Sequence, residues 1–303
     1  MLEPVVSPEV ADALSGGGAV VALETTIFSN LGLPSPANAA ALDRCVAAVR
    51  AGGAVPAITA VLDGRPRVGV DADEHERILG PARKAAERDL AVAVAQRWQF
   101  GATTVSASLT LAAEAGIAVF ATGGIGGVHR DVEATGDVSA DLDAIATHPV
   151  VTVCAGAKAF LDLAKTLEHL ETAGVPVLGW RHDWFPAFYT RSSGLPVPHR
   201  VESAAEVAAV LANRSGADHG VLLTVPIPES AELDGAALDA ALLEALADAT
   251  RDGVRGGAVT PFVLGRIAAA TAGQSVPANL ALAESNAAVA AEVAVAISGR
   301  ADG

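Results

Sequence analysis

Lysine is rare in this chain, and one of the few lysines lies where an amine could act on a substrate. Of the 20 basic residues only three are lysine: Lys84, Lys158 and Lys165. Solvated positions rarely distinguish lysine from arginine, whereas chemistry that needs a deprotonatable amine can use only lysine. Lys158 follows the apolar run of "VVTVCAGAKAFLDL" (150–163) and enters a helical pattern. Apolar neighbours and a helix N-terminus both favour the neutral amine, which could attack a carbonyl carbon.

Glu24 is a second candidate for chemistry, because it interrupts an apolar strand pattern in "VALETTIFSNLGLP" (21–34). A carboxylate at the C-terminal end of a parallel strand lies where α/β active sites form. Partial burial would raise its pKa toward the range useful for acid–base catalysis. The pattern therefore predicts a proton-transferring acid, with an acid at an exposed strand exit as the alternative.

A glycine-rich stretch, "FATGGIGGVHR" (120–130), follows another buried strand pattern. Its four glycines let backbone N–H groups point at an anion without obstruction by Cβ atoms. It has neither the lysine of a P-loop nor the spacing of a dinucleotide-binding loop. We expect it to bind a phosphate or carboxylate, with a tight glycine turn as the alternative.

Polar residues near two predicted helix starts could bind ligands or simply cap the helices. In "DVSADLDAI" (137–145), Ser139 is the predicted N-cap, and acids follow where the helix dipole favours them. Asp137, Ser139 and Asp141 beside a phosphate site would also suit a hard divalent ion such as Mg²⁺ or Mn²⁺. Asn279 is predicted to cap a C-terminal helix, the alternative being a hydrogen bond to a ligand.

The elements that must position these residues alternate between strand and helix. Apolar strand-like runs begin near residues 18, 55, 66, 117, 150, 175 and 219, with helical patterns between most of them. This alternation predicts an α/β fold with a mainly parallel central sheet, here a single three-layer α/β/α domain over 1–303. A helix over 81–97 is expected to carry Lys84. Another helix is expected from about 158 to 173, closed by Gly174.

The bulk composition limits the expected partners and compartment. A net charge of −15 argues against nucleic acid and anionic membrane surfaces, since both are bound by neutralising phosphates. Cys45 and Cys154 match no metal-binding or CxxC spacing, which predicts reduced thiols in a cytoplasmic protein. No targeting segment opens the sequence, and no charge-free stretch is long enough for a convincing membrane span.

Jointly and in order, these motifs resemble those of the pseudouridine-5'-phosphate glycosidase family, also called the indigoidine synthase A-like family. The resemblance runs over nearly the whole length and is carried by "VALETTI", "GAVPAITAVLDG", "GATTVSASL", "VFATGGIGGVHR", "DVSADL", "VCAGAKAFLDLAKTLEHLET", "FPAFYTRSSG", "VPIPE", "VTPFVLGRI" and "SVPANLALAESNA".

The resemblance implies a role for each matching residue. Glu24 matches the family's proton donor and Lys158 its nucleophile, which forms a Schiff base with the sugar. Asp137 matches a ligand of one Mn²⁺ ion per subunit. The residues implied to contact substrate are Lys84, Val105, His129, Ser139, Ala140, Asp141 and Asn279.

The activity implied is reversible cleavage of the C–C glycosidic bond of pseudouridine 5'-phosphate to uracil and ribose 5-phosphate. The implied assembly is a cytoplasmic homotrimer with small-molecule partners only. Two alternatives stay open from the residues themselves. One is another lysine-dependent lyase or aldolase acting on a sugar phosphate. The other is a non-catalytic protein that binds a sugar phosphate or nucleotide, in which Glu24 and Lys158 only form a salt bridge.

Overall fold

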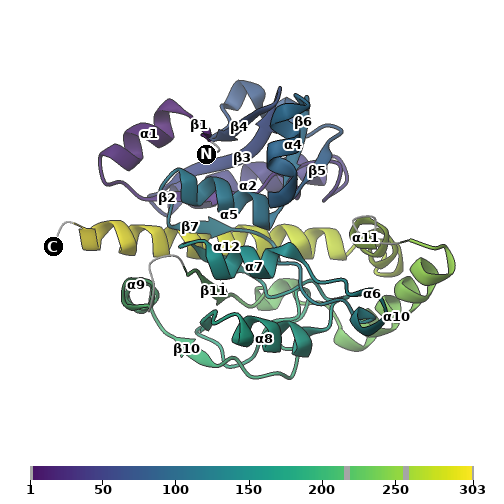
Figure 1. Ribbon diagram of the computed structural model, residues 1–303. Coiled ribbons are helices and arrows are strands. Elements are labelled where there is room, and N and C mark those ends of the chain that lie inside the picture. The colour runs from purple at the N-terminus through teal and green to yellow at the C-terminus, as the bar shows by residue number, and fades with distance from the viewer. Residues whose placement is uncertain (1–2, 215–218, 255–258, 302–303) are drawn as a thin grey trace.

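The computed structural model describes residues 3–214, 219–254 and 259–301, and its strands form one large sheet (Figure 1). In this part of the chain the main strand order is β1-β4-β3-β2-β7-β8-β11-β9-β10, with β6 on β3 and β5 on β6. The strands are β1 (Val5–Val6), β2 (Val20–Leu23), β3 (Val55–Leu62), β4 (Arg65–Val68), β5 (Arg83–Ala85), β6 (Phe100–Thr103), β7 (Val119–Ala121), β8 (Val151–Cys154), β9 (Val177–Trp180), β10 (His199–Val201) and β11 (Val221–Thr224).

The sheet is mainly parallel, which confirms the predicted fold class. From β3 through β2, β7, β8, β11 and β9 to β10, every neighbouring pair is parallel, and only the β3–β4 and β3–β6 pairs are antiparallel. The central strands are short and wholly buried, for example "VVAL" in β2 and "VTVC" in β8. Continuous apolar strands of this kind are typical of parallel sheets that helices cover on both faces.

Helices cover the two faces of the sheet. α5 and α7 pack over one face, whereas α2 and the long α12 pack over the other (Figure 1). The helices are α1 (Pro8–Ser15), α2 (Ala37–Ala51), α3 (His75–Ile78), α4 (Leu90–Ala95), α5 (Val105–Glu114), α6 (Val132–Thr135), α7 (Ala140–Thr147), α8 (Leu163–Thr172), α9 (Ala204–Asn213), α10 (Gly235–Arg251), α11 (Val259–Ala270) and α12 (Ser275–Ala301).

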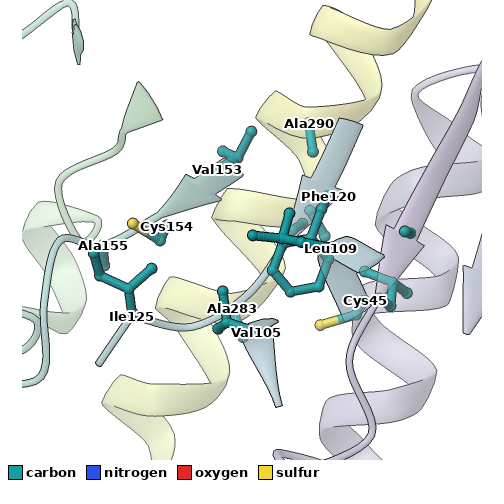
Figure 2. Close-up of a cluster of buried hydrophobic side chains, with 14 of the residues drawn as sticks. Cys45, Val105, Leu109, Phe120, Ile125, Val153, Cys154, Ala155, Ala283 and Ala290 are labelled. Atoms are coloured by element: carbon teal, nitrogen blue, oxygen red, sulfur yellow. The ribbon is translucent and has the colours of Figure 1, made fainter. Parts of the chain in front are cut away.

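The middle of the core lies where β7 and β8 are enclosed by α5 and α12. Figure 2 shows Phe120 of β7 close to Leu109 of α5, and Ala283 and Ala290 on α12. All four side chains are buried in one hydrophobic cluster. The small alanine side chains let α12 lie close to the sheet, so this packing holds the strand ends firmly.

Both cysteines belong to this core and are free buried thiols (Figure 2). Burial raises the pKa of Cys45 and of Cys154 to about 12. The thiolate is the reactive form, so neither cysteine is activated for chemistry.

α12 is long and apolar enough, by length and composition alone, to span a membrane over 275–299. More than half of that segment is buried inside the fold. Its contacts with α2, β2, β7 and β8 are those of a core helix.

Two predicted helices are wrong in ways that matter for the lysines. Residues 83–85 form strand β5, which pairs in parallel with β6, so Lys84 is not on a helix. Pairing with β6 overrides the helix propensity of this Ala-, Glu- and Arg-rich segment. The second helix begins at Leu163, capped by the Asp162 side chain, which leaves Lys158 in the preceding turn. Its predicted end is confirmed, because Gly174 follows it with a φ of 74°.

Candidate active site

A cavity of about 1110 Å³ opens at the C-terminal ends of β2, β5, β6, β7 and β8. The loops after parallel strands meet at this edge of a sheet, which explains why distant motifs converge there. Every residue that the sequence singled out for the site lines it: Glu24, Lys84, Val105, His129, Asp137, Ser139, Ala140, Asp141, Lys158 and Asn279.

Two sides of the cavity differ in character. The inner wall consists of Glu24, Lys84, Thr122, Asp141 and Lys158, which follow or lie on strand ends or, for Asp141, on the first turn of α7. The outer wall consists of residues 129–139 and of side chains from the α10–α11 pair. Those side chains are mostly apolar: Leu246, Ala249, Thr250, Val259, Thr260 and Leu264.

Glu24 is the first residue after β2 and is only 7% exposed. The Thr122 hydroxyl donates a hydrogen bond to Glu24 Oε1. Burial raises the pKa of Glu24, and the attraction of Lys158 together with the Thr122 hydrogen bond offsets only part of that rise. The alternative of an acid at an exposed strand exit is therefore wrong, and the pKa is shifted in the direction that favours a protonated, proton-donating carboxyl group.

Lys158 lies in the turn after β8, in a segment that runs beside the glycine-rich loop. Its N–H donates to the Ile125 carbonyl at 3.1 Å, and Ala157 forms a bridge with Ile125. The side chain is partly exposed and lines the cavity. Within the described residues its Nζ forms neither a hydrogen bond nor an ion pair. The amine is therefore available to a ligand.

Lys84 and Lys165 show the two fates of the other lysines. The Lys84 side chain is exposed toward the cavity, which it lines. Desolvation by the cavity walls and, to a smaller extent, repulsion from Lys158 lower its pKa. No ion pair to Lys84 occurs in the described part of the chain. Lys165 instead lies on the surface in ion pairs with Glu133 and Asp162.

One N–H group of the glycine-rich loop binds a carboxylate of the protein itself. Gly126 N–H donates to Asp141 Oδ2 at 2.8 Å, and Ser106 N–H donates to Asp141 Oδ1 at 3.1 Å. Asp141 is buried, so its carboxylate ties the loop to the first turn of α5. The N–H of Ile125 donates to the Gly156 carbonyl, and the N–H of Val128 donates to the Thr166 hydroxyl.

The loop glycines are required for close packing rather than for a left-handed backbone. A Cβ at Gly126 would lie 2.2 Å from Ser139 Oγ, and one at Gly124 would lie 2.5 Å from the Phe188 ring. Phe188 itself has a φ of 65°, a conformation that non-glycine residues rarely adopt. Such strain is typical of segments held in place at functional sites.

Ser139 caps α7 as predicted, because its hydroxyl accepts from Asp141 N–H at 3.2 Å. Asn279 does not cap α12, which begins four residues earlier, at Ser275. Asn279 Oδ1 is buried and has no hydrogen-bond partner among the described residues. The Tyr189 hydroxyl hydrogen-bonds to Asn279 and Ser275, which leaves an amide oxygen of Asn279 free to accept from a ligand.

The donors for a divalent ion are few. Asp137 Oδ2 lies 3.8 Å from His129 Nε2, and both side chains line the outer wall. Both oxygens of Asp141 are already taken by N–H groups. No cluster of three or more His, Cys, Asp or Glu side chains suited to a metal occurs in the described residues. One carboxylate and one imidazole fit a hydrated ion that keeps several waters and shares a ligand phosphate, as Mg²⁺-like ions commonly do.

The sequence alone does not identify Thr122 and Ser106 as site residues, although both lie in motifs that carry the family resemblance. Thr122 was detectable as a hydroxyl directly after a buried strand. The N–H of Ser106 acts through its position in the first turn of α5, which side-chain chemistry does not reveal. Phe188 and the α10–α11 residues carried no signal, because only the tertiary fold brings them to the cavity.

Known proteins resemble the whole chain. The sequence profile of the indigoidine synthase A-like proteins matches residues 9–296. A pseudouridine-5'-phosphate glycosidase of Rhodospirillum centenum is 55% identical over 294 residues, covering 96% of this chain and 91% of the relative. One of Sorangium cellulosum is 50% identical over 297 residues, covering 97% and 93%. The crystal structure of the prealnumycin C-glycosynthase AlnA in complex with ribulose 5-phosphate aligns with a TM-score of 0.90 at 38% identity, covering 98% of each chain.

Proposed function

Because the chain belongs to the indigoidine synthase A-like family, we propose that it cleaves pseudouridine 5'-phosphate reversibly to uracil and ribose 5-phosphate. One observation carries the proposal: two lysine amines without ion pairs and a buried carboxyl of raised pKa line the same cavity. The names of the relatives at about 50% identity support the substrate, and the AlnA structure, which is a complex with ribulose 5-phosphate, supports a sugar phosphate as ligand.

The bond to be broken explains why an amine is needed. Pseudouridine joins ribose C1' to uracil C5 through carbon, so there is no leaving nitrogen to protonate. In the proposed reaction the C1'–O4' bond breaks and O4' takes a proton, which opens the sugar ring, and the Lys158 amine bonds to C1' and loses a proton. The C1'–C5 bond then breaks with its electron pair passing to C5, which takes a proton, while C1' becomes an iminium ion. Water hydrolyses the iminium, releasing ribose 5-phosphate and the amine.

Glu24 is proposed to carry the protons for ring opening and for C5. Burial raises its pKa and so favours the protonated form, and the Thr122 hydroxyl keeps one carboxyl oxygen in a fixed position. Lys84 is the proposed cation for the phosphate, since it is unpaired and reaches into the cavity. The free oxygen of Asn279 is suited to accept an N–H of uracil.

The metal, the assembly and the compartment are parts of the same proposal. Asp137 and His129 would hold Mn²⁺, with water and substrate as its other ligands. Such an ion, when bound, offsets negative charge on the substrate phosphate. We further propose a cytoplasmic homotrimer. Without a bound metal ion, residues 129–139 would still orient the substrate from the outer wall.

The alternatives differ in what the inner wall does. In a non-catalytic binding protein Glu24 and Lys158 would form a salt bridge, yet Glu24 forms no ion pair in the described part of the chain. Another lysine-dependent lyase or aldolase would use the same amine with a different substrate, so only the products distinguish it.

Uracil release from pseudouridine 5'-phosphate, with and without added Mn²⁺, tests the function directly. Uracil and ribose 5-phosphate in equal amounts are expected. Borohydride added with ribose 5-phosphate should reduce the imine and attach the sugar to Lys158, as located by peptide mass spectrometry. Binding of substrate without uracil release would reject the proposed activity, and an adduct only on another lysine would reject the role of Lys158.

A further inference from the structure

Strands β2 and β6 meet end to end beside β3, directly behind Glu24. β3 pairs in parallel with β2 through residues 55–58 and antiparallel with β6 through residues 60–62, which leaves Thr59 between the two ladders. After β2 the chain continues beside the end of β6, where Thr26 N–H donates to the Thr103 carbonyl at 3.1 Å. The regular ladder is thus interrupted at Thr59.

Four buried hydroxyl groups fill this gap, and we call them the hydroxyl junction: Thr25, Thr59, Thr103 and Ser108, all 0% exposed. The hydroxyls of Thr25 and Thr103 donate to the Thr59 carbonyl at 3.0 and 2.8 Å. Thr59 Oγ1 lies 2.8 Å from Ser108 Oγ on α5. Thr103 N–H donates to Thr25 Oγ1 at 2.9 Å. The side chains therefore replace the backbone hydrogen bonds that the ladder lacks.

Both segments that leave the junction enter the cavity. Glu24 immediately precedes Thr25, and Thr59 Oγ1 also lies 3.1 Å from the carbonyl of Leu23, the last residue of β2. On the other side, Thr103 is followed by the first turn of α5, where Ser106 N–H binds Asp141. The junction thus anchors Glu24, the proposed proton carrier. It also anchors the contact in which the Asp141 carboxylate binds the N–H groups of Ser106 and Gly126, which we call the Asp141 clamp.

We propose that the hydroxyl junction is a positioning device for Glu24, which fixes the backbone so that the carboxyl faces Thr122 and the opened sugar at Lys158. This inference rests on the proposed function and adds to it residues that do not touch the substrate. Apolar side chains of equal size would fill the same space without directional bonds. Fully satisfied buried polar networks hold one geometry, whereas unsatisfied ones destabilise the fold.

Another buried threonine provides the contrast. Thr152 on β8 is also 0% exposed, but its hydroxyl has no hydrogen-bond partner among the described residues. Thr152→Val keeps the volume and removes an unpaired hydroxyl, so it should leave kcat unchanged. Thr59→Val makes the same chemical change inside the junction, and the pair of variants separates positioning from the general effect of replacing a core threonine.

Steady-state uracil release by the wild type, Thr59→Val, Thr59→Ser and Thr152→Val tests the proposal. A displaced Glu24 should lower kcat by about 10- to 100-fold in Thr59→Val, the size of effect that small misplacements of reacting groups produce, with KM changed far less. Thr59→Ser, which keeps the hydroxyl, should restore most of kcat. A Thr59→Val enzyme as active as Thr152→Val would overturn the proposal, as would a loss that serine does not restore.

Two further measurements test the junction if Thr59→Val does not fold or if the wild type releases no uracil. If Thr59→Val does not fold, Ser108→Ala removes one hydrogen bond of the junction: a lower kcat at unchanged KM supports the proposal, and an unchanged kcat overturns it. If the wild type releases no uracil, the proposed function has failed, and ¹³C NMR titration of the Glu24 carboxyl still tests the junction. A titration midpoint shifted in the Ser108→Ala or Thr59→Val protein but not in Thr152→Val supports it, and identical midpoints overturn it.

Discussion

The inner and outer walls of the cavity are built by opposite means. On the inner wall, Glu24 and Asp141 are buried and each is fixed by hydrogen bonds to a strand end, a loop or a helix start. On the outer wall, Asp137 is 35% exposed, and its contact with His129 spans 3.8 Å. The facing α10–α11 pair contributes mainly apolar side chains.

This difference teaches where proton transfer and where binding belong in the site. Groups that must be held at one geometry and at a shifted pKa need burial and fixed partners. Groups that only attract a hydrated ion or a phosphate work from an exposed position. We therefore expect substitutions of Glu24, Asp141 and Lys158 on the inner wall to lower kcat, and substitutions on the outer wall to change the concentrations at which ligands act.

Removing the amine of the inner wall should have the largest effect. Lys158→Ala should lower kcat by on the order of 10³-fold or more, because the variant lacks the amine proposed to form the covalent bond to C1'. Uracil release measures it, and an unchanged melting temperature shows that the fold is intact. Lys165→Ala is the matched control, since that lysine is paired on the surface. Normal turnover by the Lys158→Ala enzyme would show that this residue of the inner wall does not carry the chemistry.

Glu24→Gln should come next. The change removes the proton carrier but keeps the shape, so kcat should fall by about 10²- to 10⁴-fold while KM changes little. The ratio of the two parameters under steady-state conditions measures it. If neither parameter changes, Glu24 has only a structural role and does not carry protons in the reaction.

Glu24→Gln should also stabilise the protein relative to the wild type, and by a larger amount at high pH than at low pH. Burial raises the pKa of Glu24 above 4.5, so between 4.5 and the raised value the folded chain holds a proton that the unfolded chain has released. Stability falls with rising pH through that window, and the cost persists above it. Gln cannot ionise and avoids this cost. Melting temperatures should therefore favour Glu24→Gln over the wild type more strongly at about pH 8 than at about pH 4. An equal difference at both pH values would contradict the shift.

The sequence is enough to predict the fold class and the meeting of the motifs, because apolar strands alternate with helices and parallel strand ends share one edge. It fails at Lys84, where the helix-favouring composition of residues 81–97 conceals a short strand whose partner, β6, comes later in the chain. It also places the helix after Lys158 too early. There, the backbone of 157–162 instead binds the glycine-rich loop at Ile125 and Val128.

The site is predictable in its residues but not in their partners. Spacing identifies Asp141 as a polar residue near a glycine loop, yet it cannot show that its carboxylate binds the N–H of Gly126, one of the loop N–H groups expected for a phosphate. The Thr59 contacts with Thr25 and Thr103 depend on how β2 and β6 meet, a long-range feature that local propensity does not encode. Roles follow from residue type, whereas competition among partners requires the fold.

Asp141→Asn tests whether the clamp of the inner wall depends on charge. An Asn side chain has one acceptor oxygen and would turn its amide N–H groups toward Gly126 or Ser106. Losing one charge-assisted hydrogen bond should cost about 2–3 kcal/mol in urea unfolding, with kcat reduced because the loop beside Lys158 loosens. Asp143→Asn, on the same helix but with an exposed side chain that contacts His169, should change neither quantity. Equal stability of the two variants would contradict the clamp.

Asp137→Asn should have the smallest effect and should change only what the outer wall is proposed to do. The carboxylate is partly exposed and lies 3.8 Å from His129, its ion-pair partner in the described part of the chain, so the melting temperature should stay at that of the wild type. If Asp137 helps to hold a hydrated Mn²⁺, the concentration that gives half-maximal uracil release should rise by about 10-fold or more, with kcat recovered at saturating metal. Asp131→Asn, on the same wall, controls for the loss of one negative charge. A Mn²⁺ response identical in the two variants would rule out Asp137 as the ligand, and a loss of kcat that metal does not restore would place Asp137 functionally on the inner wall.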